Sequence, residues 1–444
     1  MMNTPIYDFI ENYINSDFMR LHVPGHKGSE NPFDITEIEG ADVLYHENGI
    51  LGDSQSNASL IFGTAKTVYS AEGSSLGIRG MLTLIKMYSE EKGRRPVVAA
   101  GRNAHKVFMT ASALLGIEVK WIYPENAESV VSAEITPEGL RDFLLSLEEM
   151  PAAVYITSPD YIGNRADIRG LSEVCREYGV LLAVDNAHGA YLKFLSEDRH
   201  PITLGADMCC DSAHKTLPVL TGGAYLHISR NAPASLCDNA RKAMSLFAST
   251  SPSYLILASL DKVNKSLSEG YSDKIRKTAE ITEKLKGVLE ENGYFLAGNE
   301  PLKISIKAKE YGYYGTEIAD ILRSNKIEVE FSDPDFVVMM ITPENGEEEL
   351  RYLEKILLSV PKKERISSVI PEIIPCEQAM SVGEALFKPS ESISVNNAAG
   401  RILASPSVSC PPAVPIAICG EKLSDNAVKC FNYYGTQEID VIRE

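Results

Sequence analysis

Residues 180–191 read VLLAVDNAHGAY, and this stretch gives the strongest indication of the fold. Five apolar or small residues, the length of a buried strand, run directly into Asp185. Strand-like runs at 97–100, 119–123 and 153–157 precede it and alternate with helix-like runs at 107–115, 136–147 and 170–178. This alternation is typical of a mostly parallel sheet covered by helices on both faces.

Asp185 ends its strand where open α/β sheets bind ligands, although an aspartate there can also be an ordinary cap or turn residue. Thirty residues later, 211–216 read DSAHKT and contain Lys215. A partly desolvated lysine has a lowered pKa and can form a Schiff base, while neighbouring Ser and His side chains can hold a phosphate. Pyridoxal phosphate (PLP) needs such a lysine and a carboxylate against its pyridine nitrogen. The Asp–Lys pair therefore indicates PLP.

Two further stretches fit such a site. Residues 71–77 read AEGSSLG and open a helix-like run, so they could present N–H and hydroxyl groups to an anion, or simply cap the helix. Residues 102–106 read RNAHK and follow the strand-like run at 97–100. His105 could stack on a cofactor ring, although a single histidine is more often structural.

Composition narrows the class of protein. The 444 residues allow about two to four domains. A net charge of −18, from 43 basic and 61 acidic residues and without a basic stripe, argues against a nucleic-acid partner. The eight cysteines show no zinc-binding spacing, so we expect reduced thiols in the cytoplasm and no metal site. We find no signal peptide and no apolar run long enough to cross a membrane.

The character of the chain changes along its length. We expect an N-terminal arm at 1–40, a large domain at 41–295, a small α+β domain at 296–362 and a C-terminal domain at 363–444. Long helices are expected at 254–294. The final boundary rests on proline content, because eight of the 23 prolines lie in the last 84 residues.

These motifs resemble, in their order, those of the Orn/Lys/Arg decarboxylase family, specifically its short arginine-decarboxylase-like branch. The matching stretches are Leu21–Gly28 (LHVPGHKG), Asp34–Glu37, Gly49-Ile50 with Gln55, Glu72–Ser75, Arg102–Lys106, Asp185–Ala190, Ser212–Pro218, Ser249–Tyr254, Pro411–Pro415 and Gly420-Glu421. The resemblance implies a fold type I (aspartate aminotransferase-like) large domain with a mostly parallel seven-stranded sheet. It also implies a small α+β domain, a short C-terminal domain, and decarboxylation of arginine, lysine or ornithine.

The resemblance also implies roles for individual residues. Lys215 would form the Schiff base with PLP, Asp185 would pair with the pyridine nitrogen, and His105 would stack on the ring. Lys215 or His214 would return a proton to the substrate. The residues expected to hold the phosphate or otherwise contact the cofactor are Ser74, Ser75, Ala187, His188, Ser212 and His214. Thr250 and Ser251 would reach the phosphate from a partner subunit of a homodimer, and Glu421 would help to recognise the distal cation of the substrate.

Among the positions that depart from the family pattern, five stand out. Glu72 replaces Asn, Asn186 replaces Glu, Tyr191 replaces His, Gly222 replaces Gln and Cys410 replaces Tyr. Two alternatives stay open, and these positions motivate the second of them. One is another fold type I enzyme, an aminotransferase or amino acid lyase, for which Arg323 or Arg351 could bind the substrate carboxylate. The other is a catalytically weakened PLP-binding regulatory protein.

Overall fold

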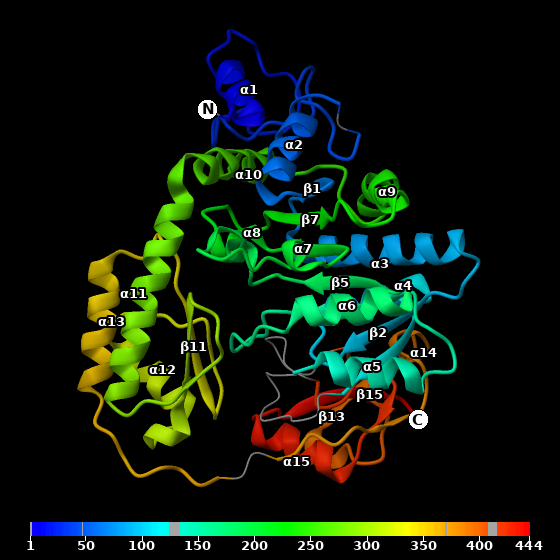
Figure 1. Cartoon of the computed structure of the whole chain (residues 1–444), viewed down its shortest axis with the longest axis vertical. Helices are drawn as coiled ribbons and strands as arrows, with labels where there is room; N and C mark the ends of the chain where they lie inside the picture. Colours follow the sequence, from blue (N-terminus) through cyan, green and yellow to red (C-terminus); the bar gives the residue numbers. More distant parts are fainter. Residues whose placement is uncertain (1, 47, 124–133, 369–370, 407–414) are drawn as a thin grey trace. The chain divides into compact units, whose positions relative to one another are not determined.

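The computed structural model describes residues 2–46, 48–123, 134–368, 371–406 and 415–444 (Figure 1). Cys410 and residues 411–414 of the predicted C-terminal motif therefore lie outside the described residues. The chain divides into two compact units. The first comprises Met1–Val98, Leu147–Ser158 and Asp167–Arg276, and the second comprises Ala99–Ser146, Pro159–Ala166 and Lys277–Glu444.

The largest sheet has seven strands in the order β1-β7-β6-β5-β4-β2-β3. Its strands are β1 (Lys66–Ser70), β2 (Val97–Gly101), β3 (Glu118–Ile122), β4 (Ala153–Thr157), β5 (Leu181–Asp185), β6 (Met208–Asp211) and β7 (Ala224–Ile228). Strands β4, β5 and β6 pair in parallel, whereas β7 runs antiparallel to both β6 and β1. The predicted mostly parallel seven-stranded sheet is thus confirmed.

Helices of the first unit flank its strands. They are α1 (Pro5–Ile14), α2 (Ile50–Phe62), α3 (Gly73–Glu91), α6 (Ile168–Tyr178), α7 (Pro201–Leu204), α8 (Ala213–Thr216), α9 (Ala234–Ser245) and α10 (Tyr254–Ser266), with a 3₁₀ turn at Ala190–Phe194. Helix α6 shows why these segments fold as they do. Asp167 accepts a hydrogen bond from the backbone N–H of Gly170 at its start, and Gly179 ends it with φ 66°.

The sequence analysis did not predict α1 or α2 in the polar N-terminal stretch. Helix α1 buries Ile6 and Ile10 completely. The Asp261 carboxylate in α10 accepts hydrogen bonds from the Ile6 and Tyr7 backbone N–H groups, each at 3.0 Å, and so caps the start of α1. Contacts distant in sequence therefore stabilise this short helix.

The expected long helices at 254–294 are present with one interruption. Helix α10 continues through Leu267–Tyr271 into α11 (Ser272–Glu291). Within that turn Gly270 has φ 106°, a conformation that glycine adopts at little cost, so the helix bends there.

The second unit contains a four-stranded sheet in the order β10-β11-β9-β8. The strands are β8 (Leu296–Ala297), β9 (Lys303–Lys307), β10 (Phe331–Ser332) and β11 (Phe336–Met340). Helix α12 (Gly315–Ser324) lies near β11, and α13 (Glu347–Ser359) lies beside α11 (Figure 1). One hydrophobic core joins this sheet to both helices and to the end of α11.

The second unit also contains further helices and short strands. They are α4 (Lys106–Leu115), α5 (Pro137–Ser146), β12 (Glu377–Gln378), α14 (Val382–Leu386), β13 (Ser390–Ser394), β14 (Glu421–Lys422), α15 (Asp425–Tyr433) and β15 (Glu438–Ile442). Strands β13 and β15 pair antiparallel, as do β12 and β14. Phe431 and Cys430 of α15 are buried in a second core with Val441 of β15. No helix among the described residues is long and apolar enough to span a membrane.

Candidate active site

Asp185 lies at the carboxyl end of β5 and is 2% exposed. The Tyr155 hydroxyl donates to one carboxylate oxygen at 3.1 Å, and the Ala187 backbone N–H donates to the other at 3.2 Å. The Cys210 thiol lies 3.9 Å from that second oxygen. Burial, followed by the charge of Asp185, raises the pKa of Tyr155 well above its ordinary value, so this hydroxyl stays protonated and remains a donor.

Lys215 lies in α8, a short helix that follows β6 directly. Its Nζ lies 2.9 Å from Nε2 of His188, within hydrogen-bonding distance. Cys210 lies within electrostatic reach of both Asp185 and Lys215. Burial and then the charge of Asp185 raise the pKa of the Cys210 thiol, while the charge of Lys215 opposes that rise. The carboxylate and the amine predicted to act together therefore lie around one buried cysteine.

A cluster of small polar groups lies at the start of α3. Ser212 Oγ donates to Ser74 Oγ at 2.8 Å. Gly73 opens the helix with φ 70°, and its N–H donates to the Gly222 carbonyl at 2.7 Å. Ser75 lies in the first turn of α3, where unpaired N–H groups favour an anion.

His214 faces the same loop from α8. Its ring Nδ1 lies 2.9 Å from the Gly223 carbonyl, so Nδ1 carries a proton and donates it. Burial lowers the pKa of His214, and nearby Lys215 lowers it further, which favours the neutral ring. In that form Nε2 is a hydrogen-bond acceptor, so His214 can donate to a phosphate only after it is protonated.

The loop that contains Thr250 and Ser251 also approaches α3. Both residues are exposed. The Ser249 backbone N–H donates to the Glu72 carboxylate at 2.7 Å. Glu72, one of the positions that departs from the family pattern, thus connects this loop to the start of α3 within one chain.

His105 and Glu421 belong to the second unit. His105 precedes α4, and its Nδ1 accepts a hydrogen bond from the Val107 N–H at 3.2 Å. Glu421 is 1% exposed, and Arg102 donates to both of its carboxylate oxygens at 2.9 and 3.0 Å. The Tyr123 ring lies under the same guanidinium at 5.0 Å. Glu421 could contact a substrate cation only if this buried pair opened, and its predicted role stays a prediction.

The first unit thus contains ten of the twelve residues predicted for the site. Three contacts join some of them directly: Ser74 to Ser212, Asp185 to Ala187, and His188 to Lys215. Tyr155 and Cys210 were not predicted. The register pairs Cys210 with Asp185, and β4 lies beside β5, so strand adjacency was the signal that could have revealed both residues.

The structure shows the neighbours of three further positions that depart from the family pattern. Asn186 Nδ2 donates to Asp211 Oδ1 at 2.8 Å, and Tyr191 is fully buried. Gly222 has φ 100°, and a Cβ there would lie 2.9 Å from the Ala71 carbonyl oxygen. A side chain at position 222 would therefore require this turn to move.

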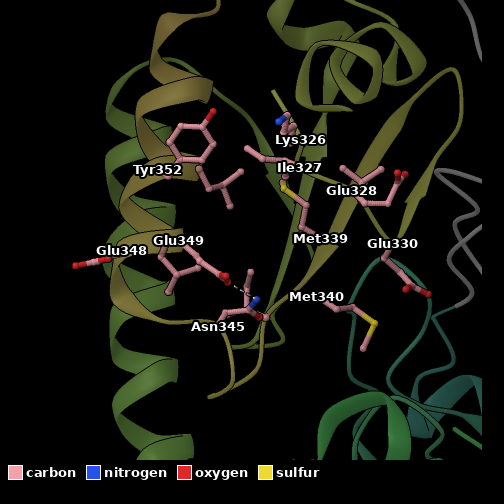
Figure 2. Close-up of a pocket in the computed structure, with 14 residues that line it drawn as sticks. Lys326, Ile327, Glu328, Glu330, Met339, Met340, Asn345, Glu348, Glu349 and Tyr352 are labelled. Atoms are coloured by element: carbon pink, nitrogen blue, oxygen red, sulfur yellow. Dashed lines mark hydrogen bonds between the residues drawn. The ribbon is translucent and has the colours of Figure 1, made fainter. Parts of the chain in front are cut away.

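A separate pocket of about 640 Å³ lies in the second unit, between α13, the segment 326–330 and the end of β11 (Figure 2). Its lining includes Met339, Tyr352 and four glutamates, of which Glu349 accepts a hydrogen bond from Asn345. None of the twelve predicted site residues lines it.

Comparison with known proteins agrees with the geometry. Residues 4–293 match the major domain of the Orn/Lys/Arg decarboxylases. An arginine decarboxylase of Bacillus subtilis is 28% identical over 96% of this chain and 92% of its own length. Another, from Bacillus anthracis, is 27% identical over 95% of this chain and 91% of its own.

Solved structures show the same fold at lower identity. The lysine decarboxylase of Francisella novicida has a TM-score of 0.79 at 16% identity and covers all of this chain and 81% of its own length. The constitutive lysine decarboxylase of E. coli gives a TM-score of 0.75 at 14% identity over all of this chain and 82% of its own. The fold is that of the fold type I PLP enzymes. With its major-domain match spanning residues 4–293, the chain is an enzyme that belongs to the Orn/Lys/Arg decarboxylase family.

Proposed function

We propose that this enzyme uses PLP to decarboxylate a basic L-amino acid. Arginine, giving agmatine, is the first expected substrate, and lysine or ornithine, giving a diamine, come next. The arginine decarboxylases that align along nearly the whole chain support this order. Pocket depth would discriminate among the three side chains.

One observation carries the proposal. Asp185 is a buried carboxylate, and among the described residues no ion pair connects it to a basic side chain. A buried carboxylate without a cationic partner is unfavourable by several kcal/mol. A protonated pyridine nitrogen would provide the missing charge, and hydrogen bonds from Tyr155 and Ala187 keep the carboxylate oriented.

The opposite end of the proposed site fits a phosphate. The Ser74 and Ser212 hydroxyls meet at the start of α3, a 19-residue helix. Hydroxyls and free helix N–H groups are the donors that phosphate prefers. Lys215 follows Asp185 by 30 residues in sequence and lies in the helix that also carries His214.

Bound PLP would supply an electron sink for the pair released when the substrate carboxylate leaves as CO2. Asp185 would hold the proton on the pyridine nitrogen. Lys215 Nζ and His188 Nε2, 2.9 Å apart, can share a proton and return it to the substrate Cα, and His214 Nε2 is a second candidate. The burial of Asp185 and Cys210 excludes water from this side of the site.

The surroundings of the two arginines considered for an aminotransferase favour decarboxylation. Arg323 pairs with Glu328 and Asp320 and is 57% exposed at its side chain. Arg351 pairs with Glu347 and is 76% exposed. Both arginines are exposed and already paired with acidic side chains, so neither is placed to bind a substrate carboxylate in a buried site.

We also propose a homodimer with shared active sites. Four exposed apolar side chains lie within six residues of the sequence in the N-terminal arm: Phe18, Met19, Leu21 and Val23. Such a cluster on a soluble enzyme is typical of an interface. Thr250 and Ser251, which are exposed beside the loop of α3, are available to a partner subunit.

A complementation assay tests the shared site. Lys215→Ala and Thr250→Ala/Ser251→Ala subunits, inactive alone, should recover about a quarter of wild-type activity after unfolding and refolding together. That value follows because half of the dimers would be mixed and one of their two sites would be intact. No recovery in confirmed mixed dimers would place Thr250 and Ser251 in the site of their own chain.

The predicted domains at 1–40, 41–295, 296–362 and 363–444 stay a proposal. The hydrophobic core around β9 and α13 supports a small domain, whereas the core around α15 also includes Phe336 and Val338 of β11 and so joins the predicted small and C-terminal domains. We likewise propose a cytoplasmic location, supported by the unpaired state of the seven cysteines that the structure describes.

Activity assays with arginine, lysine and ornithine test the function. We expect PLP-dependent CO2 release, fastest with arginine, and no keto-acid formation. Lys215→Ala serves as the inactive control. Keto acid without CO2 would indicate an aminotransferase, and cofactor-loaded protein that releases no CO2 from any of the three would support the regulatory alternative.

A further inference from the structure

A second group of reactive side chains surrounds β6. Cys209 and Asp211 come from β6, His227 from β7 and His200 from the residue before α7. All four are fully buried. Because side chains alternate along a strand, Cys209 and Asp211 lie on the face opposite Cys210, which contacts Asp185. This group is therefore separate from the proposed PLP site.

The donor atoms are spaced like the ligands of one ion. His200 Nε2 lies 3.0 Å and His227 Nε2 lies 3.4 Å from Asp211 Oδ2. Cys209 Sγ lies 3.9 Å from His200 Nε2 and 3.8 Å from Asp211 Oδ1. Zinc bonds of about 2.0–2.3 Å in a tetrahedron place neighbouring ligand atoms roughly 3.3–3.8 Å apart. These four spacings lie between 3.0 and 3.9 Å, and the donor atoms of His200, Cys209 and Asp211 all lie within 4.8 Å of one another, whereas His227 is placed by its contact with Asp211 alone.

The histidines provide an independent indication. Neither His227 Nε2 nor His200 Nδ1 has a hydrogen-bond partner among the described residues. His227 Nδ1 bonds to Thr67 Oγ1 at 2.9 Å, which fixes the ring with Nε2 directed at Asp211. Asn186 holds the other oxygen of Asp211 at 2.8 Å. Outer contacts of this kind orient metal ligands.

We propose that His200, Cys209, Asp211 and His227 bind one Zn²⁺ ion. A thiolate, a carboxylate and two neutral imidazoles make an N, S and O ligand set that suits zinc. Two negative ligands neutralise the dication, so the complex could be buried without net charge. Binding transfers the Cys209 thiol proton to solvent.

The proposed ion would have a structural role. Four protein ligands fill a tetrahedral site and leave no position for a water or substrate molecule. The ion would connect β6, β7 and the start of α7, and β6 ends four residues before Lys215. The ligands include one cysteine and lack the usual cysteine spacing, which explains why the sequence analysis expected no metal.

Metal analysis tests the proposal. Cofactor-loaded protein purified without chelators, incubated with Zn²⁺ and desalted should retain about one zinc per chain. Cys209→Ser and His227→Gln should lose most of it. The control is Cys175→Ser, which removes a buried cysteine of α6 and should retain the ion. Wild-type protein with less than about a tenth of an equivalent, or full retention in both variants, would overturn the proposal.

Spectroscopy keeps the test decisive if the variants fail to fold. Wild-type protein loaded with Co²⁺ in place of zinc should show the strong visible bands of tetrahedral cobalt and a thiolate-to-cobalt charge-transfer band. Weak octahedral bands without sulfur coordination would mean that cobalt binds elsewhere. The cluster would then be a buried histidine–aspartate hydrogen-bonded network only.

Discussion

A buried carboxylate lies on each face of β6, but the two carboxylates have different neighbours. On one face Cys210 lies beside Asp185, which has hydroxyl, amide and thiol neighbours. On the other face Cys209 lies beside Asp211, which has imidazole nitrogens at 3.0 and 3.4 Å. Imidazole groups of the chain contact Asp211, whereas in the part of the chain that the structure describes no basic side chain forms an ion pair with Asp185.

This difference distinguishes a structural carboxylate from one that is available for chemistry. Burial alone would raise the pKa of Asp211, but the contacts with His200 and His227 outweigh it and lower that pKa. A carboxylate balanced in this way stabilises the fold. Asp185, by contrast, can be balanced by a charge that arrives with a ligand, as the proposed pyridine nitrogen would. The following predictions test this distinction, from the largest expected effect to the smallest.

Replacing Lys215 should produce the largest effect. Lys215→Ala removes both the amine that would attach the cofactor and one candidate proton donor, so activity should fall by at least about 1,000-fold. The visible absorbance of bound cofactor should disappear or shift. An unchanged spectrum with normal CO2 release would refute the role of Lys215.

Asp185→Asn should reduce kcat by roughly 100-fold, because the pyridine nitrogen would lose its charged partner. Thermal stability should change little or rise, since the substitution removes a buried charge without a basic partner. Absorbance, kcat and melting temperature would be measured together. A large fall in stability with unchanged kcat would mean that Asp185 resembles Asp211 in function.

Asp211→Asn should show the opposite pattern. It leaves His200 and His227 without their anionic partner, which should lower the free energy of unfolding by about 1–3 kcal/mol. Denaturant titration would measure this change. The kcat of the folded fraction should stay within about threefold of wild type, because Asp211 does not contact the proposed reacting groups. A selective loss of kcat would contradict the separation of the two faces.

Tyr155→Phe provides a milder test of the Asp185 side. It removes one hydrogen bond to the carboxylate, worth about 1 kcal/mol, so kcat/KM should fall by roughly fivefold. Asp185→Asn/Tyr155→Phe should be little worse than Asp185→Asn alone, because both act through one carboxylate. Fully additive losses would show that Tyr155 acts independently.

His214 and His227 give the finest comparison, because burial lowers the pKa of both imidazoles. Each pKa is lower in the folded chain than in the unfolded chain. Each histidine therefore makes stability rise with pH up to about 6.5, the ordinary histidine pKa. Inorganic phosphate should raise the pKa of His214 alone if it binds at the α3 loop. NMR titration of the imidazoles would measure this, and equal shifts at both residues would count against that location.

Sequence periodicity predicted the parallel strands well, because β4 and β5 are apolar runs of the right length between helix-like segments. It missed α1, whose stability depends on Asp261, a residue distant in sequence. Linear motifs singled out Lys215 and Asp185, whose roles stay predictions. They could not reveal Tyr155, the Arg102–Glu421 pair or the cluster around Asp211, because those arrangements depend on strand pairing and on contacts across long sequence separations.

Borohydride reduction of the PLP-loaded enzyme tests the central claim most directly. Reduction converts a lysine Schiff base into a stable secondary amine, and peptide mass spectrometry then locates the attached pyridoxyl group. The account predicts one modified peptide, with the group on Lys215, and none in Lys215→Ala. Modification of a different lysine, or cofactor that is bound but never attached, would contradict it.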